Sequence, residues 1–249
     1  TMNLKNLEYL KENLKYLGFD NHLNAELESH IQKKSPDFSI KTEIPHFNKM
    51  IEFDLQFKRS ETTEMYFLNK YDATLKQDNM PDLQHRFYLN NGNGITAKEA
   101  FNLLEGRSVF KELMNKNQEK YQAWLQLDMG NRDENGQFKM KQYHVNYGFN
   151  LEEKLSGLPL KELQNQEQKE GLIRSLNKGN FQQATLLEDG KERRIFIEAS
   201  PQYKNLNIYN DKLKPERLEL KEERKQAKEQ KQDLSDAPRQ KRSKKQQLT

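Results

Sequence analysis

Cysteine is absent from this 249-residue chain, and so is any long apolar run. Without thiols the chain forms no disulfide, and a metal site or a nucleophile has to come from other side chains. Lys5, Glu8, Lys11 and Glu12 interrupt every apolar stretch at the start, and no run of about 18 apolar residues occurs elsewhere. We therefore expect a soluble, cytoplasmic protein with no membrane partner.

Excess positive charge is missing from most of the chain. The formal net charge is +4, yet residues 214–249 carry 12 basic and 7 acidic side chains, which leaves 30 basic and 31 acidic residues upstream. A near-neutral body thus precedes a basic tail, so the overall charge says little about the surface of the folded part. Aromatic residues also stop at Tyr209. We expect the tail to be helical near its start and disordered beyond Asp233.

The N-terminal region has the spacing of two helices. Leucines recur every three or four residues over 4–17, and Gly18 is placed to end that helix. Asp20 or Asn21 can cap a second helix that runs to about Lys34. We expect residues 1–35 to form a helical hairpin with one apolar side, which has to pack on the rest of the chain or on a partner.

The body, residues 36–213, alternates strand and helix signals. Apolar and polar residues alternate without error over 51–58, which predicts a half-buried antiparallel strand. Asn135-Gly136 and Asp189-Gly190 predict tight hairpin turns. Thr96 and Glu99 form a capping-box pair that opens a helix over 97–104. The other predicted strands are 65–75, 85–90, 121–128, 138–147, 182–188, 193–199 and 205–209, and the other predicted helices are 151–155 and 167–176.

These patterns predict an α+β fold of antiparallel hairpins and sheets with packed helices, the N-terminal helical hairpin in front and the disordered basic tail behind. Leu55-Gln56-Phe57 echoes Leu125-Gln126-Leu127, each in the first strand of a predicted hairpin. A weak duplication of 44–106 and 117–213 could produce this echo, but antiparallel hairpins resemble one another in any case.

The end of the tail is a candidate nucleic-acid site. Five basic residues in seven can bind phosphates by releasing counterions, without reading sequence. No aromatic residue is interleaved to stack on bases. The alternatives are a tail that only solubilises the protein or that docks on an acidic protein. The five residues are Arg239, Lys241, Arg242, Lys244 and Lys245.

A second candidate surface surrounds the only tryptophan. In the strand 121–128 the odd positions form the apolar face, which leaves Trp124 on the other face with polar neighbours. A mixed aromatic and polar surface of this kind can recognise peptides or bases. The alternative, which we favour, is a sheet covered on both sides by helices. The candidate partner-binding residues are Trp124, Gln122, Gln126, Tyr143, His144 and Tyr147.

Nothing in the sequence indicates catalysis. No pair of histidines has metal-binding spacing, and Ser108 follows Gly106 but lacks the second glycine of a G-x-S-x-G nucleophile elbow. Gly92-x-Gly94-x-x-Ala97 has the short form of a dinucleotide fingerprint, but the preceding strand is polar, so a glycine-rich turn into a capped helix explains it better. We expect no cofactor, no metal and no enzyme activity.

Several segments together resemble a bacterial family known as domain of unknown function 3945, whose members are frequently carried on conjugative and other mobile elements. These segments are 94–109, 121–128, 141–144, 146–148, 159–163 and 196–204. The resemblance runs from about Met2 to Tyr209. Ser200 and Tyr203 depart from it, since Asn and Phe are expected there. The resemblance implies no activity and no site residues; it implies only an association with mobile elements, which favours nucleic-acid or defence-related partners.

Two functions follow as hypotheses. The first is a non-enzymatic accessory protein of a mobile genetic element, such as a conjugative transposon, which binds DNA or RNA through its basic tail and a protein partner through its body. The alternative is a protein-binding module, for example an inhibitor of a host defence factor, with no nucleic-acid role.

Overall fold

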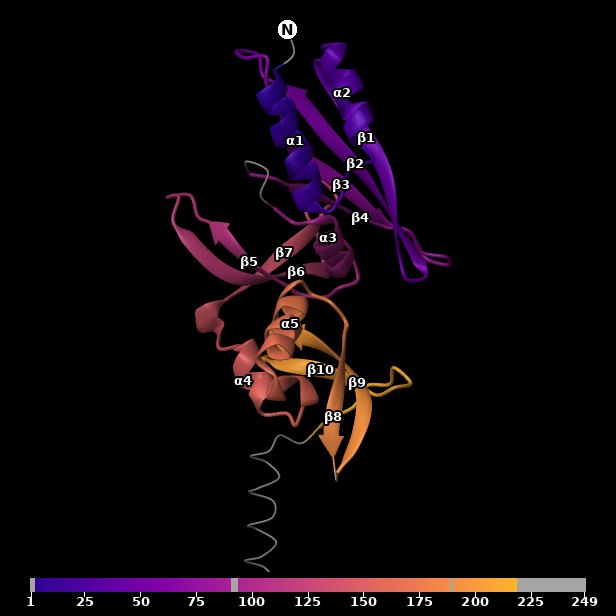
Figure 1. Ribbon diagram of the computed structural model, residues 1–249, viewed down its shortest axis with the longest axis vertical. Coiled ribbons are helices and arrows are strands. Elements are labelled where there is room, and N and C mark those ends of the chain that lie inside the picture. The colour runs from indigo at the N-terminus through magenta and orange to yellow at the C-terminus, as the bar shows by residue number, and fades with distance from the viewer. Residues whose placement is uncertain (1–2, 91–93, 189, 219–249) are drawn as a thin grey trace, which may run out of the picture.

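A computed structural model of the protein describes residues 3–90, 94–188 and 190–218. The first layer is an antiparallel sheet with strand order β1-β2-β3-β4, and two helices pack against one of its faces (Figure 1). Phe19 lies between them and contacts Phe53 at 5.0 Å between ring centroids. The elements are α1 (Leu4–Leu17), α2 (Asn24–Gln32), β1 (Asp37–His46), β2 (Lys49–Arg59), β3 (Tyr66–Leu75) and β4 (Leu83–Tyr88).

A second antiparallel sheet, of order β5-β6-β7, follows a single helix. Thr96 accepts a hydrogen bond from the backbone of Glu99, and the Glu99 carboxylate accepts one from the backbone of Thr96, so the predicted capping box is confirmed. The turn at Gly136 has the positive φ that the Asn-Gly pair predicts. The elements are α3 (Ala97–Leu104), β5 (Val109–Met114), β6 (Lys120–Arg132) and β7 (Phe138–His144).

The third sheet, of order β10-β9-β8, packs with two further helices at the other end of the molecule (Figure 1). Three short 3-10 turns join its elements to the rest and to one another. The elements are η1 (Val145–Tyr147), α4 (Leu151–Ser156), η2 (Lys161–Gln164), α5 (Gln166–Asn177), β8 (Gln182–Glu188), β9 (Lys191–Ser200), η3 (Pro201–Tyr203) and β10 (Asn205–Tyr209).

The described chain has two hydrophobic cores, and the middle sheet separates them. On β6, Leu125 and Leu127 belong to the core shared with α1, α2, α3 and the first sheet. Trp124, one position away, belongs to the core shared with α4, α5 and the third sheet. Because successive side chains of a strand point to opposite faces, one strand supplies both cores. The middle sheet is therefore covered on both sides, as the favoured interpretation of its pattern predicted.

A buried polar contact joins α3 and the residue Arg107 that follows it to the segment just after α5. Arg107, just after α3, donates from Nε to the Gly179 carbonyl at 2.9 Å and from Nη2 to Asn102 Oδ1 at 2.7 Å. Asn102 in turn donates from Nδ2 to the Lys178 carbonyl at 2.6 Å and to Asn180 Oδ1 at 2.9 Å. Burial lowers the pKa of Arg107. We call Asn102, Arg107 and residues 178–180 the clasp.

Gly179 allows the segment after α5 to approach the start of β5 closely. Its φ is +76°, a region that L side chains rarely adopt, and a Cβ built on it would lie 2.7 Å from the Ser108 carbonyl oxygen and 3.0 Å from a Val109 methyl. A glycine is therefore required at this point of the clasp.

The α+β class of antiparallel sheets is confirmed, and the predicted strands and helices are present with small shifts of their ends. Three details were wrong. The second helix begins at Asn24 with Leu23 at its N-cap position, so neither Asp20 nor Asn21 caps it, and Leu23 has no side-chain acceptor. Strand β7 ends at His144, and 145–147 form a 3-10 turn. Strands β1 and β5 were not predicted.

Some predictions lie beyond what the structure describes. Residues 219–249, including the five basic residues from Arg239 to Lys245, and Asp189 of the second predicted turn lie outside the described residues. The duplication of 44–106 and 117–213 stays a prediction. The N-terminal helices, predicted as a separate hairpin over 1–35, share the first core with the sheet that follows them. None of the described helices is long and apolar enough to cross a membrane.

Candidate functional site

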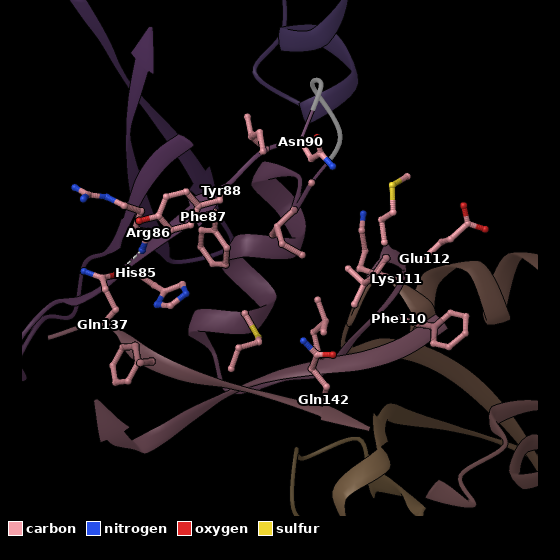
Figure 2. A pocket seen from close by; sticks show the side chains of 18 of the residues that line it. His85, Arg86, Phe87, Tyr88, Asn90, Phe110, Lys111, Glu112, Gln137 and Gln142 are labelled. Atoms are coloured by element: carbon pink, nitrogen blue, oxygen red, sulfur yellow. Dashed lines mark hydrogen bonds between the residues drawn. The ribbon is translucent and has the colours of Figure 1, made fainter. Parts of the chain in front are cut away.

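A cleft of about 1350 Å³ lies between the first sheet and the middle sheet. Strand β4 forms one wall, β5 the opposite wall, and β6 with β7 the floor, as Figure 2 shows. The volume exceeds that of a typical small-molecule pocket, about 300–1,000 Å³. The floor includes alternate positions of β7, of which the first is buried in the first core, the second is half-buried and the third is exposed. These are Phe138, Met140 and Gln142.

Strand β4 is the edge of its sheet, and its free edge faces the cleft. Just after β4, the Leu89 N–H donates to the carbonyl of Asn69 in β3. In this register the backbone N–H groups of odd-numbered β4 residues bond to β3, and those of even-numbered residues point away from it. Arg86 is one of these even positions, and its N–H donates to Gln137 Oε1 at 2.6 Å (Figure 2). A side-chain oxygen thus occupies the place that the carbonyl of a neighbouring strand would take.

The cations that line the cleft are paired within the chain. Arg86 forms a two-bond ion pair with Asp72 at 2.7 and 2.8 Å, and Asp72 holds the pKa of Arg86 above its ordinary value. Lys111 reaches both carboxylate oxygens of the buried Glu99, at 3.0 and 3.2 Å. Lys120 pairs with Glu112 at 2.8 Å. These pairs leave no unpaired Lys or Arg among the described residues that line the cleft, so backbone groups and apolar surface are its main binding features.

His85 is the buried titratable group of the cleft wall. Its side chain is 7% exposed and lies between the rings of Phe87 and Phe138, with centroids at 4.8 and 6.4 Å. Burial lowers the pKa of His85 to about 4, although the nearby Asp133 carboxylate opposes this shift. Its Nδ1 has no hydrogen-bond partner among the described residues. The imidazole is therefore neutral near pH 7.

Two of the predicted partner-binding residues are core residues. Trp124 is 4% exposed and packs edge-on against Phe149, with ring centroids 5.4 Å apart. Tyr143 is 8% exposed and belongs to the same second core. The less favoured alternative, an accessible face around Trp124, was wrong, because α4, α5 and the third sheet cover that side of β6.

The other predicted partner-binding residues are spread over different surroundings. Gln126 donates to the Gly106 carbonyl at 2.8 Å and so supports the chain just before the clasp. His144 is exposed and stacks on Tyr121 at 5.3 Å. Gln122 is exposed on β6 opposite Glu112. Tyr147 is 40% exposed and lies 5.1 Å from the Tyr143 ring. The structure does not bring these six residues into one surface.

A different cluster forms around Tyr147. The Tyr147 hydroxyl donates to the Gln202 carbonyl at 3.1 Å, and Lys204 Nζ lies 4.7 Å from the centre of the Tyr147 ring. Tyr203, between these residues, is 74% exposed. We call Tyr143, Tyr147, Tyr203, Lys141 and Lys204 the tyrosine patch.

Sequence reasoning missed the cleft and part of this patch. Tyr143 and Tyr147 were predicted as partner-binding residues, whereas 201–204 was noted only as part of a family resemblance; in the structure these segments meet at the tyrosine patch. Tyr203 and Lys204 carry no sequence signal of their own beyond being a polar and aromatic pair after a strand. Gln137 was hidden within a predicted hairpin.

Within the described residues, no group of three or more His, Asp or Glu side chains is placed to hold a metal ion. No protein-family model, no curated protein and no solved structure matches the chain.

Proposed function

We propose that this protein is a non-enzymatic accessory protein that binds a protein partner through the cleft of its body and nucleic acid through its basic tail. The observation that carries the proposal is edge strand β4, which lies along the cleft with its Arg86 N–H bonded to a side-chain oxygen. An exposed sheet edge above an apolar floor is the arrangement that accepts an extended peptide as an additional strand.

The paired charges of the cleft support a peptide as its ligand. Backbone hydrogen bonds to β4 would supply affinity, and the apolar floor would receive alternate side chains of the peptide. Displacing the Gln137 oxygen from Arg86 would cost little, because a peptide carbonyl replaces it. The partner is therefore a protein that offers an extended apolar segment.

The tail supports the second half of the proposal through its charge. Residues 214–249 hold five more basic than acidic side chains, and the rest of the chain is close to neutral. The resemblance to a family found on conjugative and other mobile elements gives the context that we propose for this role. We also propose the cytoplasm as its location.

A matched pair of variants tests the cleft. Tyr88 is an even, outward-facing position of β4 and is 72% exposed. Tyr88→Pro removes the outward N–H, whereas Tyr88→Ala keeps it. Peptides selected from a random display library on the full chain should bind Tyr88→Ala and lose binding to Tyr88→Pro by at least about tenfold. Equal binding to both variants would argue against strand addition at β4. Circular dichroism of both variants controls for folding.

The tail is tested in the full-length protein by replacing its five basic residues with glutamine, which we call the tail-neutral variant. Fluorescence anisotropy with labelled DNA and RNA at about 50 mM and 200 mM salt should show salt-sensitive binding that this variant loses. Unchanged binding would remove the nucleic-acid role of the tail and leave the protein-binding module. The replaced residues are Arg239, Lys241, Arg242, Lys244 and Lys245.

A further inference from the structure

The exposed part of the tyrosine patch is built from two short turns. Tyr147 ends η1 and Tyr203 ends η3, and each turn is followed by a residue with positive φ, Gly148 at +91° and Lys204 at +52°. The Lys204 N–H closes its turn by donating to the Pro201 carbonyl at 2.9 Å. The Tyr147 hydroxyl bonds to the backbone of the other turn at Gln202. The two turns thus hold each other, and the Tyr147 ring is positioned before any ligand arrives.

The charge of this patch is not neutralised. Lys141 pairs with Asp128 at 3.1 Å, but Lys204 forms no ion pair with any described residue and lies over the Tyr147 ring instead. Tyr203 has no ring contact with another described residue and is 74% exposed. An ammonium group without an ion-pair partner among the described residues therefore lies over the Tyr147 ring, and the exposed Tyr203 precedes it in the sequence.

We propose that the tyrosine patch binds single-stranded nucleic acid, with a base stacked on Tyr203 and a neighbouring phosphate held by Lys204. Stacking on aromatic rings combined with a cation for the backbone is how proteins hold single strands without reading their sequence. A duplex keeps its bases stacked inside, so it offers no free face to Tyr203. The unpaired Lys204 favours a polyanion over a neutral peptide at this site.

This inference goes beyond the proposed function, which assigns nucleic acid to the tail. The patch would add a preference for single strands to the charge-driven contacts of the tail, since five lysines and arginines without aromatic residues do not distinguish single strands from duplexes.

The experiment compares full-length variants by anisotropy with a labelled oligothymidine of about 15 nucleotides and with its duplex, a length that suits one binding surface. Tyr203→Ala should weaken single-strand binding about tenfold and leave duplex binding unchanged. Tyr203→Phe keeps the ring and should bind like the original protein. Lys204→Asn tolerates the left-handed backbone and removes the charge, so it should weaken single-strand binding and reduce its salt dependence.

Tyr88→Ala is the matched control, because Tyr88 is 72% exposed but lies on β4 at the cleft. It should leave oligothymidine binding unchanged. The proposal is overturned if Tyr203→Ala binds the oligothymidine as tightly as the original protein, or if the original protein does not bind it at about 50 mM salt. An effect of Tyr203→Ala on peptide capture and none on oligothymidine would also overturn it, and would make the patch a protein-binding surface.

The tail-neutral variant separates this inference from the proposed function. If the patch is right and the tail is not, Tyr203→Ala weakens single-strand binding and the tail-neutral variant does not. If the tail alone binds, the tail-neutral variant loses both probes and Tyr203→Ala loses neither.

Discussion

The two faces of strand β7 serve two different surfaces. Phe138, Met140 and Gln142 line the floor of the cleft, whereas Lys141 and Tyr143 belong to the tyrosine patch. The alternation of a β-strand thus places an apolar set and a cationic, aromatic set one residue apart. Although other elements cover most of both faces of the middle sheet, part of each face stays accessible along β7 and can bind a ligand.

The two surfaces differ in how they treat charge. In the cleft Arg86 and Lys111 are each bonded to a carboxylate of the same chain. In the tyrosine patch Lys204 has only a ring beneath it among the described residues. Neutralised cations leave backbone groups to bind a ligand, while a free cation attracts an anion. This difference is why we assign a peptide to one surface and a nucleic acid to the other.

The largest expected loss of stability comes from removing a core side chain on either face of the middle sheet. Trp124→Ala and Leu125→Ala remove neighbouring side chains from opposite cores, and each should lower the free energy of unfolding by about 3–5 kcal/mol in urea titrations. Gln122→Ala, an exposed position of the same strand, should change it by no more than about 0.5 kcal/mol. A Trp124→Ala protein as stable as the original would contradict a second core on that face.

The clasp offers the next largest effect. Gly179→Ala adds a Cβ against the Ser108 carbonyl at a positive φ, and should lower the free energy of unfolding by about 3 kcal/mol. Gly106 also has a positive φ, of +82°, but a Cβ there meets nothing within 4 Å. Gly106→Ala should therefore cost only the backbone strain, about 1 kcal/mol. Equal losses in thermal or chemical unfolding would show that the close approach at Gly179 does not matter.

Protonation of His85 at acidic pH should lower the stability of the folded protein. Its pKa of about 4 in the folded protein lies below the ordinary 6.5, so between these values the unfolded chain binds more protons. The free energy of unfolding should therefore fall as the pH drops from about 6.5 to about 4, by about 2 kcal/mol from this residue.

His85→Gln should flatten that part of the stability profile. His46, whose pKa burial also lowers, would continue to contribute in the same direction. If His85→Gln kept the full slope, protonation of His85 would not be its source.

The smallest effect is expected at the cleft edge. Gln137→Ala removes the acceptor of the Arg86 N–H and should lower the free energy of unfolding by about 1 kcal/mol or less. Hydrogen exchange gives the sharper measurement: the Arg86 amide should exchange faster, while the Phe87 amide, which faces β3, should not change. Gln137→Glu keeps an oxygen acceptor and should protect Arg86. Unchanged exchange at Arg86 would mean that its amide is covered by something other than Gln137.

Sequence patterns predicted the elements whose chemistry is local. Strand β2 alternates because one face is buried, and α3 carries its own capping box. Strand β5 was missed because each face mixes apolar and charged residues, which removes the alternation. Val109 enters the first core and Phe110 packs on Trp124, but the next two residues are charged. Strand β1 was missed because prolines lie before it and within it, at Pro36 and Pro45, and these usually interrupt strands.

The candidate sites depend on contacts between distant parts of the chain. Gln137 reaches Arg86 across 51 positions, and Tyr147 reaches Gln202 across 55. No periodicity or motif reports such a meeting, because it depends on how the three sheets pack. The sequence did indicate Tyr147 as a surface residue, placed Trp124 on the face opposite the first core and favoured a cover over it. It could not show that α4, α5 and the third sheet would form that cover.

Strand β7 also limits how this sequence can change. A substitution at an odd or an even position alters one surface and leaves the other as it was, so the two can diverge separately under selection. A single-residue insertion in 138–144 would exchange them at once, turning Lys139 and Lys141 toward the apolar floor and Phe138 or Met140 toward the second core. Point substitutions should therefore accumulate in β7, while its length should be invariant among relatives.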